Sequence, residues 1–186
     1  MRSKRAVTGG LQKVVGETAS RLDGRAFESA AVAELLFLGL NCAVPMVDSG
    51  IDVLAWKPKR SPIKVQVKGR NFLGHGTGVE SYRFSLSSYD EPGTKPDYVL
   101  MGLRDIQGGK VAGRNGVSWL VFSSKKFDEL RSGEIISERG EHLVANVWAE
   151  FDRGRATKVV FQKGYGRPKP GIDMTPYINA WNTIHV

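Results

Sequence analysis

Two neighbouring strand-like runs carry an acid, an amide and an ammonium group at positions that could meet on one surface. The first run, residues 51–56, contains Asp52, and the second, residues 63–68, contains Gln66 and Lys68. Both runs are rich in β-branched and aromatic residues, which favour strands. Carboxylate and amide oxygens bind hard metal ions, and an ammonium group beside them can steady a water molecule. The three side chains therefore predict a site that holds a divalent cation and a reactive water.

The spacing of the two runs indicates a β-hairpin. The stretch between them includes Pro58 and Pro62, which are typical of a connecting turn. Side chains alternate across a strand, so the even-numbered residues of the second run share one face. Pairing the runs puts Asp52 opposite Gln66 or Lys68, at the ~4.5–5.5 Å that separates facing residues. Two plainer interpretations remain: Asp52 could cap a turn, and the other two side chains could form the solvated face of an edge strand.

A helix upstream of the hairpin contributes a candidate fourth member. Residues 25–40 contain strong helix formers and no proline. At about 100° per residue, Glu28 falls in the same stripe as Val32 and Leu35. A carboxylate within an apolar stripe is expensive to bury without a partner or a metal ion, whereas Glu34 lies to the side. We therefore expect Glu28, and not Glu34, to belong to the site.

The order of these residues resembles that of the PD-(D/E)XK nuclease superfamily: a helix glutamate, an aspartate that opens a strand, and a Gln-x-Lys triplet on the next strand. The superfamily includes archaeal Holliday junction resolvases and some intron homing endonucleases, and the resemblance covers residues 24–71. It implies that Asp52 and Gln66 bind a divalent metal ion and that Glu28 supports the metal shell. It also implies that Lys68 activates or steadies the attacking water.

Two positions depart from the family pattern. Ile51 stands where the family name has a proline, which does no chemistry. Gln66 stands where the family has an acid, and an amide oxygen can bind Mg²⁺ but brings no charge, so the metal affinity should fall. Some homing endonucleases of the superfamily carry the same Gln-x-Lys variant. The change makes Glu28 more important for balancing the charge of a divalent cation.

The residue types suit hydrolysis of a phosphodiester bond, which needs a positioned water and neutralisation of charge on the phosphoryl oxygens. Asp52 and Glu28 would supply the carboxylates that Mg²⁺ prefers. Gln66 and the carbonyl oxygen of Val67 would complete an open set, in which Mn²⁺ can replace Mg²⁺. The sequence thus predicts a Mg²⁺-dependent DNA endonuclease of the homing, restriction or junction-resolving type. Two alternatives stay open: a nucleic-acid-binding module on a nuclease fold that does not cut, and an RNA-directed nuclease.

The charge balance favours a polyanionic partner. The 186 residues include 27 Lys and Arg against 19 Asp and Glu, a formal net charge of +8. Cations gather around the proposed hairpin, and such a patch would select a phosphate backbone. The candidate DNA contacts are Lys57, Lys59, Arg60, Lys64 and Arg70. Because two DNA strands usually need two active sites, we also expect a homodimer or a higher homo-oligomer.

The length suits one α/β domain, and the resemblance implies a restriction-endonuclease-like mixed central β-sheet flanked by helices. We expect a basic arm at 1–23, a nuclease-like domain at 24–163, and a Gly/Pro-rich C-terminal extension at 164–186 packed on or near that domain. The expected strands lie at 42–47, 51–56, 63–68, 82–86, 97–103, 117–122, 144–150 and 158–162, and a short helix lies at 125–131.

Cysteine use and hydropathy place the chain in the cytoplasm, without a membrane partner. Cys42 is the only cysteine, which excludes an intrachain disulfide, and no run of about 20 apolar residues occurs. Near the C-terminus, Tyr177 and Trp181 are four residues apart, a spacing that favours the docking of a terminal helix.

Overall fold

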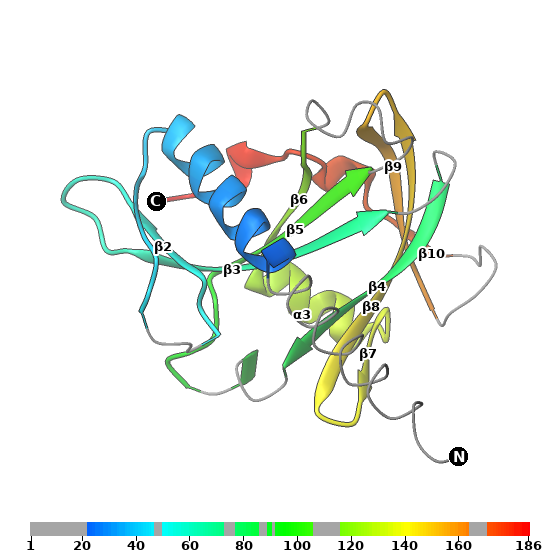
Figure 1. Cartoon of the computed structure of the whole chain (residues 1–186). Helices are drawn as coiled ribbons and strands as arrows, with labels where there is room; N and C mark the ends of the chain where they lie inside the picture. The colour runs from blue at the N-terminus through cyan, green and yellow to red at the C-terminus, as the bar shows by residue number, and fades with distance from the viewer. Residues whose placement is uncertain are drawn as a thin grey trace, which may run out of the picture.

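The computed structural model describes residues 22–46, 50–72, 77–85, 89–90, 92–105, 116–163 and 171–186 (Figure 1). Of the expected basic arm, residues 1–21 lie outside the described part. Residues 164–170 of the expected C-terminal extension also lie outside it. Residues 22 and 23, which we had assigned to the arm, already belong to the first described helix.

A five-stranded mixed sheet carries the predicted hairpin. Its strand order is β1-β2-β3-β5-β6, and β3 pairs in parallel with β5 while the other neighbours are antiparallel. The strands are β1 (Asn41–Ala43), β2 (Val53–Trp56), β3 (Ile63–Phe72), β5 (Tyr98–Asp105) and β6 (Ser118–Ser123). The pairing of Val53 with Val65 and of Ala55 with Ile63 confirms the hairpin.

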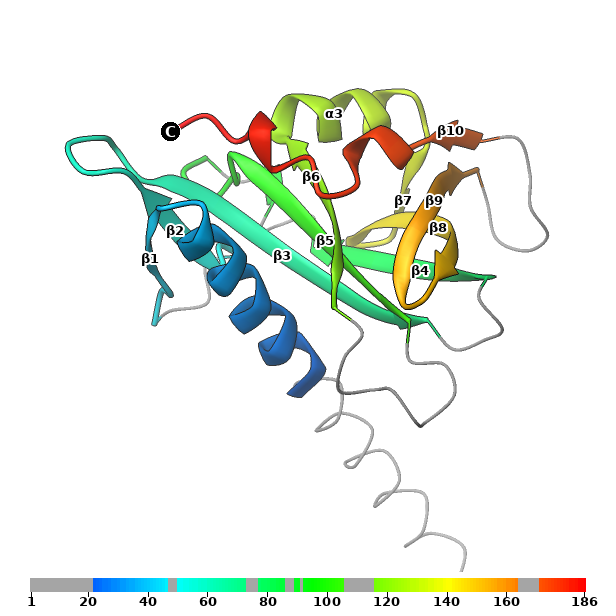
Figure 2. The same ribbon diagram turned by 90° about the horizontal axis from the view of Figure 1, so that it is seen from above.

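A helix over residues 22–37 covers one face of this sheet (Figure 2). Its apolar stripe is Phe27, Ala31 and Leu35, which are buried against residues of β2, β3, β5 and β6. Gly39, two residues beyond the last helical residue, adopts a positive φ of 77° that a glycine tolerates without strain, and it stops the helix. The amide of Leu40 then donates to the carbonyl oxygen of Leu35 at 3.2 Å, which closes the helix three residues earlier than expected.

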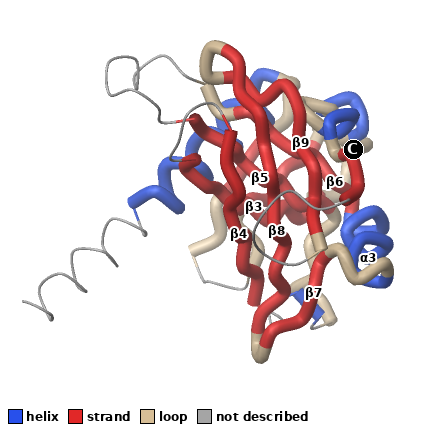
Figure 3. Tube along the Cα trace, turned by 90° about the vertical axis from the view of Figure 1, so that its right-hand side faces the viewer, coloured by secondary structure: helices blue, strands red, loops and turns tan. Residues whose placement is uncertain are grey.

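A second, antiparallel sheet and a short helix cover the opposite face. The sheet order is β10-β9-β8-β4, with β7 also paired to β8, and Figure 3 shows β4, β8 and β9 side by side. Its strands are β4 (Thr77–Ser85), β7 (Ile136–Arg139), β8 (His142–Asp152), β9 (Arg155–Gln162) and β10 (Gly171–Asp173). The helix α3 (Ser124–Ser132) begins at Ser123, whose side chain accepts a hydrogen bond from the amide of Lys126.

The larger hydrophobic core lies between the two sheets and beneath α3. It includes Phe84, Met101, Phe122, Phe127 and Phe161, all of them fully buried. The hydroxyl group of Tyr82 on β4 crosses this core and donates to the carbonyl oxygen of Gly102 on β5 at 3.1 Å. The expected fold class, an α/β arrangement with a mixed central sheet and helices on its faces, is therefore confirmed, and the second sheet is an addition that we had not predicted.

The terminal helix expected near Tyr177 and Trp181 is wrong. The structure has two 3₁₀ turns instead, η1 (Thr175–Tyr177) and η2 (Trp181–Thr183). Asn179 interrupts the segment with a φ of 51°, and its amide donates to the carbonyl oxygen of Trp119 at 2.6 Å. The segment nevertheless packs on the domain, because the ring of Trp181 contacts that of Trp119 with centroids 6.1 Å apart. Among the described helices, none has the length and apolar character that crossing a membrane requires.

Candidate active site

Asp52 occupies the point where β2 stops pairing with β3. Its backbone amide donates to the carbonyl oxygen of Val65 at 3.0 Å, and its Oδ2 atom accepts a hydrogen bond from the amide of Val67 at 2.6 Å. The regular ladder ends with Val53 opposite Val65, and one further step of the same register puts Asp52 opposite Gln66. The carboxylate of Asp52 thus accepts the hydrogen bond that a backbone carbonyl would accept if the pairing of the two strands continued, and this bond fixes the direction of the carboxylate.

Gln66 is buried beside Asp52, with only 1% of its surface exposed. Within the part of the chain that the structure describes, its Oε1 atom has no hydrogen-bond partner. A buried acceptor without a partner costs about 1–3 kcal/mol, and a cation bound to it would remove that cost. An amide oxygen next to a carboxylate is a donor set that fits Mg²⁺.

Lys68 shares a face of β3 with Gln66. Val65 and Val67 point into the core beneath the first helix, so strand alternation directs Gln66 and Lys68 to the opposite face. The Nζ atom of Lys68 lies 6.0 Å from the centroid of the Phe84 ring on β4, which agrees with this direction. The hairpin therefore brings together three of the four predicted catalytic residues.

The backbone of Val67 completes this edge of the strand. In a strand, the N–H and C=O groups of one residue point to the same side. Because the amide of Val67 donates to Asp52, its carbonyl oxygen faces the same side of β3, beyond the last regular pair of β2. This position is compatible with the predicted role of the Val67 carbonyl as a metal ligand.

Glu28 stands apart from these three residues. Its carboxylate pairs with Arg25 at 3.0 Å, and its side chain is 23% exposed. The prediction that Glu28 lies within the apolar stripe is wrong, because Ala31 is at the centre of that stripe and Glu28 is on its flank. Glu28 projects from the helix on the face opposite to Gln66, so it can approach Asp52 only around the exposed edge of β3.

The flank that Glu28 occupies is the one nearer to β2. Glu34 lies on the other flank, where it lines a hollow together with Arg104 of β5 and Trp119 of β6. Since β5 and β6 lie on one side of β3 and β2 lies on the other, Glu28 faces the β2 side. That is the side on which β2 ends and Asp52 begins.

Two glycines that we had not singled out set the distance between the helix and β3. Gly69 and Gly102 are register partners on β3 and β5. A β-carbon at Gly69 would lie 2.0 Å from the Phe27 ring, and one at Gly102 would lie 2.6 Å from it. The aromatic ring therefore fills a notch that only glycines leave open. An isolated glycine inside a strand pattern signals a close approach of this kind, and Gly69 directly follows Lys68.

The predicted DNA-contacting cations fall into two groups. Lys57, Lys59 and Arg60 are exposed on the turn that joins β2 to β3, and Arg70 is exposed further along β3. Lys64 has a structural contact, because its Nζ atom donates to the carbonyl oxygen of Gly93 at 2.8 Å. The tip of the hairpin thus keeps exposed cations, whereas Lys64 also holds a neighbouring loop.

The acids, histidines and cysteine of the described residues form no metal-binding cluster. No three side chains of His, Cys, Asp or Glu cluster in the part of the chain that the structure describes. The predicted ligand set differs from such a cluster, because it has only two carboxylates and takes its other oxygens from Gln66 and the Val67 carbonyl.

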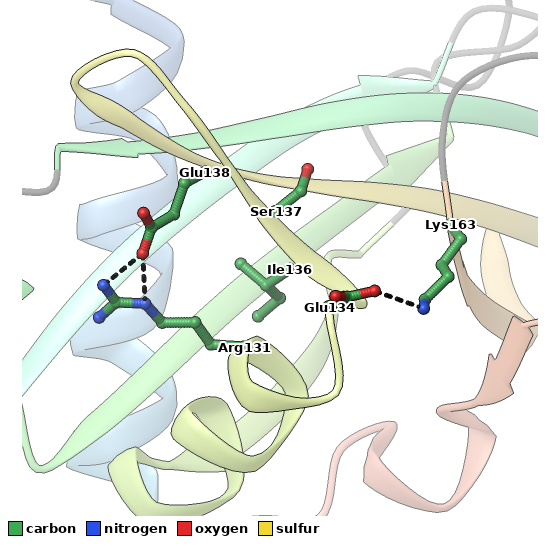
Figure 4. Close-up of a pocket in the computed structure, with 6 residues that line it drawn as sticks. All are labelled: Arg131, Glu134, Ile136, Ser137, Glu138 and Lys163. Atoms are coloured by element: carbon green, nitrogen blue, oxygen red, sulfur yellow. Dashed lines mark hydrogen bonds and ion pairs between the residues drawn. The ribbon is translucent and has the colours of Figure 1, made fainter.

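A second hollow, of about 390 Å³, lies at the junction of α3 and β7 (Figure 4). The guanidinium group of Arg131 pairs with Glu138 at 2.6 Å and with Asp90 at 2.6 Å, and these hydrogen bonds raise its pKa. Lys163 pairs with Glu134 at 2.8 Å. These charges are paired, and none of the predicted site residues lines this hollow.

No protein-family model matches the chain, and neither does any curated protein. Among solved structures, the chain is similar to a bacterial homing endonuclease, I-Ssp6803I, with 15% sequence identity, coverage of 87% of this chain and 90% of that chain, and a TM-score of 0.49. It is also similar to Hjc, a Holliday junction resolvase from the archaeal hyperthermophile Archaeoglobus fulgidus, with 15% identity, coverage of 65% and 81%, and a TM-score of 0.37. Both neighbours are nucleases of the kinds that the sequence resemblance names. Because both TM-scores lie below 0.5, the function is inferred from the site residues.

Proposed function

We propose that the protein is a metal-dependent endonuclease that hydrolyses phosphodiester bonds in DNA, with Mg²⁺ as its cofactor. The observation that carries this proposal is the buried Oε1 atom of Gln66, which lacks a partner among the described residues; Gln66 lies opposite Asp52, one step beyond the last regular pair of β2 and β3. Lys68 lies on the same face of the strand. A buried acceptor in this position lowers the stability of the fold unless a cation binds to it.

Each residue of the set has a definite task. Asp52, Gln66 and the Val67 carbonyl would hold the cation, and Glu28 would contribute a second carboxylate from the flank of the helix. When bound, Mg²⁺ would polarise a phosphoryl oxygen and lower the pKa of a water molecule. Lys68 would steady that water and assist the transfer of its proton. The hydrogen bond from the Val67 amide holds the Asp52 carboxylate in one direction, so that little reorganisation is needed.

The surface charge supports a nucleic-acid substrate. The net charge is +8, and the exposed Lys57, Lys59 and Arg60 lie at the tip of the same hairpin that carries Asp52 and Gln66. At ~3.4 Å per residue, the tip extends on the order of 15–20 Å from Asp52, which is within one turn of a DNA duplex. A duplex bound at the site would therefore pass close to these cations.

Cleavage assays with Mg²⁺, with Mn²⁺ and with EDTA test the proposal. Supercoiled, linear and branched DNA serve as substrates, together with single-stranded DNA and RNA. We expect metal-dependent cutting that falls by at least ~10²-fold in Asp52→Ala and in Lys68→Ala, because each removes a group that acts in the reaction. Glu34→Ala is the matched control, since this helix acid lies on the flank away from β2. Full cleavage by Asp52→Ala would exclude this site.

A second candidate function is binding without cleavage. The observation in its favour is Gln66 itself, because an amide in place of an acid weakens the hold on a cation. This alternative predicts salt-sensitive binding of DNA and no heat of Mg²⁺ or Mn²⁺ binding by calorimetry. An RNA-directed nuclease would cut the RNA substrate in preference to the DNA substrates of the same assay.

A further inference from the structure

An apolar surface surrounds the end of the first helix and the edge strand β1. The structure describes seven large apolar side chains that are exposed, and five of them come from residues 36–46. They are Leu36, Phe37, Leu38, Val44 and Met46. Phe37 is 88% exposed, although an aromatic ring of this size is normally among the first side chains to be buried. We call these five residues the 36–46 surface.

The segment that forms the 36–46 surface carries no charged residue of its own. The segment from 36 to 46 contains no Asp, Glu, Lys, Arg or His, in a chain of which 25% is charged. A surface that binds a phosphate backbone needs cations, so nucleic acid does not fit here. Exposed apolar surface of this extent marks a place where a protein contacts another protein, a membrane or an apolar ligand.

The five residues come from one segment of the chain, which lies next to the β2–β3 hairpin. The helix end lies beside β1, and β1 is the terminal strand of its sheet, paired with β2 (Figure 2). The five side chains together offer on the order of 600 Å² of apolar area, compared with roughly 800 Å² per partner in an ordinary stable interface. Ala43 on β1 is exposed between them and adds to the area.

We propose that the 36–46 surface is the interface through which two copies of this chain associate. In a twofold-symmetric dimer the same patch meets itself, so a patch of one sign of charge would repel its copy. On a chain with a net charge of +8, a neutral apolar patch is a place where two copies can meet without pairing or burying charge. The exposure and composition of the patch favour this interface whether or not the protein cuts DNA.

The position of the interface has a consequence for the candidate site. Through β1 and β2, the 36–46 surface connects directly to Asp52. A dimer formed there would hold the two copies of the hairpin in a fixed relation, as cleavage of both strands of a duplex requires.

Sedimentation equilibrium of the full chain, without DNA or divalent metal, tests the proposal. We expect the mass of two 20.4 kDa chains, and we expect the association to persist in ~0.5 M salt, where contacts between charges are screened. Phe37→Glu should weaken the dimer by at least ~30-fold in dissociation constant, because it puts two like charges into the interface and removes an aromatic anchor. Leu22→Glu is the matched control, since Leu22 is an exposed apolar residue at the other end of the same helix, and it should leave the dissociation constant unchanged.

Site-specific photo-cross-linking gives an independent readout. With p-benzoylphenylalanine at position 37, illumination should yield a covalent dimer, with the cross-link mapped to residues 36–46 of the other copy; at position 22 it should not. A monomer at tens of micromolar protein, or a Phe37→Glu variant that associates as the wild type does, would overturn the proposal. Cross-links confined within one chain would also overturn it, because they would assign the surface to a segment of the same chain. The cleavage assay plays no part in these outcomes, so the interface and the catalytic function can fail separately.

Discussion

The ring of Phe27 lies so close to Gly69 that a β-carbon at Gly69 would be 2.0 Å from it. Phe27 precedes Glu28 on the helix, and Gly69 follows Lys68 on β3. This one contact therefore sets the spacing between the element that carries the helix carboxylate and the strand that carries the amide and the ammonium group. The edge-to-face contact of Phe27 with Trp119, with centroids 6.3 Å apart, holds the ring in place from the β6 side.

Gly69→Ala should destabilise the protein and displace the helix. The added methyl group overlaps a ring that is enclosed by two strands, and overpacking of this kind costs about 1–3 kcal/mol. We expect a fall of several degrees in the unfolding temperature and a loss of DNA cleavage, measured by calorimetry and by the plasmid assay.

A double-mutant cycle identifies the cause of that loss. Phe27→Ala removes the ring. Gly69→Ala should therefore lower the free energy of unfolding by at least about 1 kcal/mol less in the Phe27→Ala background than in the wild type. Gly24→Ala is the control, because no atom lies within 4 Å of a β-carbon at this exposed helix position. Equal costs of Gly69→Ala in the two backgrounds would show that the ring contact is not responsible.

Gln66→Glu should strengthen metal binding while weakening the metal-free protein. A second carboxylate beside Asp52 would be buried at a position that is 1% exposed, which destabilises the chain without a cation. A bound divalent ion would neutralise it, so the rise in unfolding temperature on adding Mn²⁺ should be larger than in the wild type. Thermal unfolding with and without Mn²⁺ measures both effects.

The chain offers a close control for this substitution. Gln162 on β9 is also buried, at 2% exposure, and its Oε1 atom likewise lacks a partner among the described residues. No candidate ligand of the proposed site lies beside it, so Gln162→Glu should be destabilising and Mn²⁺ should not reverse the loss. Equal effects of Mn²⁺ on the two variants would contradict a cation site at Gln66.

The hairpin tip should supply phosphate contacts. Replacement of Lys57, Lys59 and Arg60 by alanine should lower the dependence of DNA affinity on salt by up to about 0.9 in log–log slope for each lost contact. Fluorescence anisotropy in EDTA, over a series of salt concentrations, gives this slope without cleavage. Lys163→Ala is the control, because this cation follows β9 and pairs with Glu134 in the turn between α3 and β7. A triple variant with the wild-type slope would place the DNA elsewhere.

The hairpin was predictable because its signals are local. Alternating side chains in residues 63–68 and two prolines in the turn define the strands and their pairing, and the observed register, which continues to Asp52 opposite Gln66, is one of the two that the sequence left open. The strands β7 and β10 were missed for the same reason. In β7 only Ile136 is buried, and β10 has no buried residue, so neither has an apolar pattern that its own sequence could show.

The relation of the helix to the site was not predictable from periodicity. An apolar stripe 100° wide can be centred on several residues, and the sequence does not say which of them meets the sheet. The notch formed by Gly69 and Gly102 decides this question, because it receives Phe27 and so turns Glu28 to the flank. That notch joins two strands that are far apart in sequence, and only the parallel pairing of β3 with β5 brings the glycines together.

Tyr89 should make the stability depend on pH in the alkaline range. Burial, and then the charge of Asp128, raise the pKa of this phenol above its ordinary value of 10.0, and its hydroxyl group donates to Asp128 Oδ1 at 3.1 Å. The folded state thus favours the protonated phenol. The contribution of this phenol to the free energy of unfolding is fully present below pH ~10, and it is lost as the pH rises above that value, by up to about 1.36 kcal/mol per pH unit. Tyr89→Phe keeps the ring contact with Phe127 but cannot ionise. Denaturant unfolding at pH 8 and pH 11 measures the difference in free energy of unfolding between the wild type and this variant. We expect the wild type to be the more stable at pH 8 and this difference to shrink or reverse at pH 11. A difference that is the same at both pH values would mean that the phenol does not titrate on unfolding.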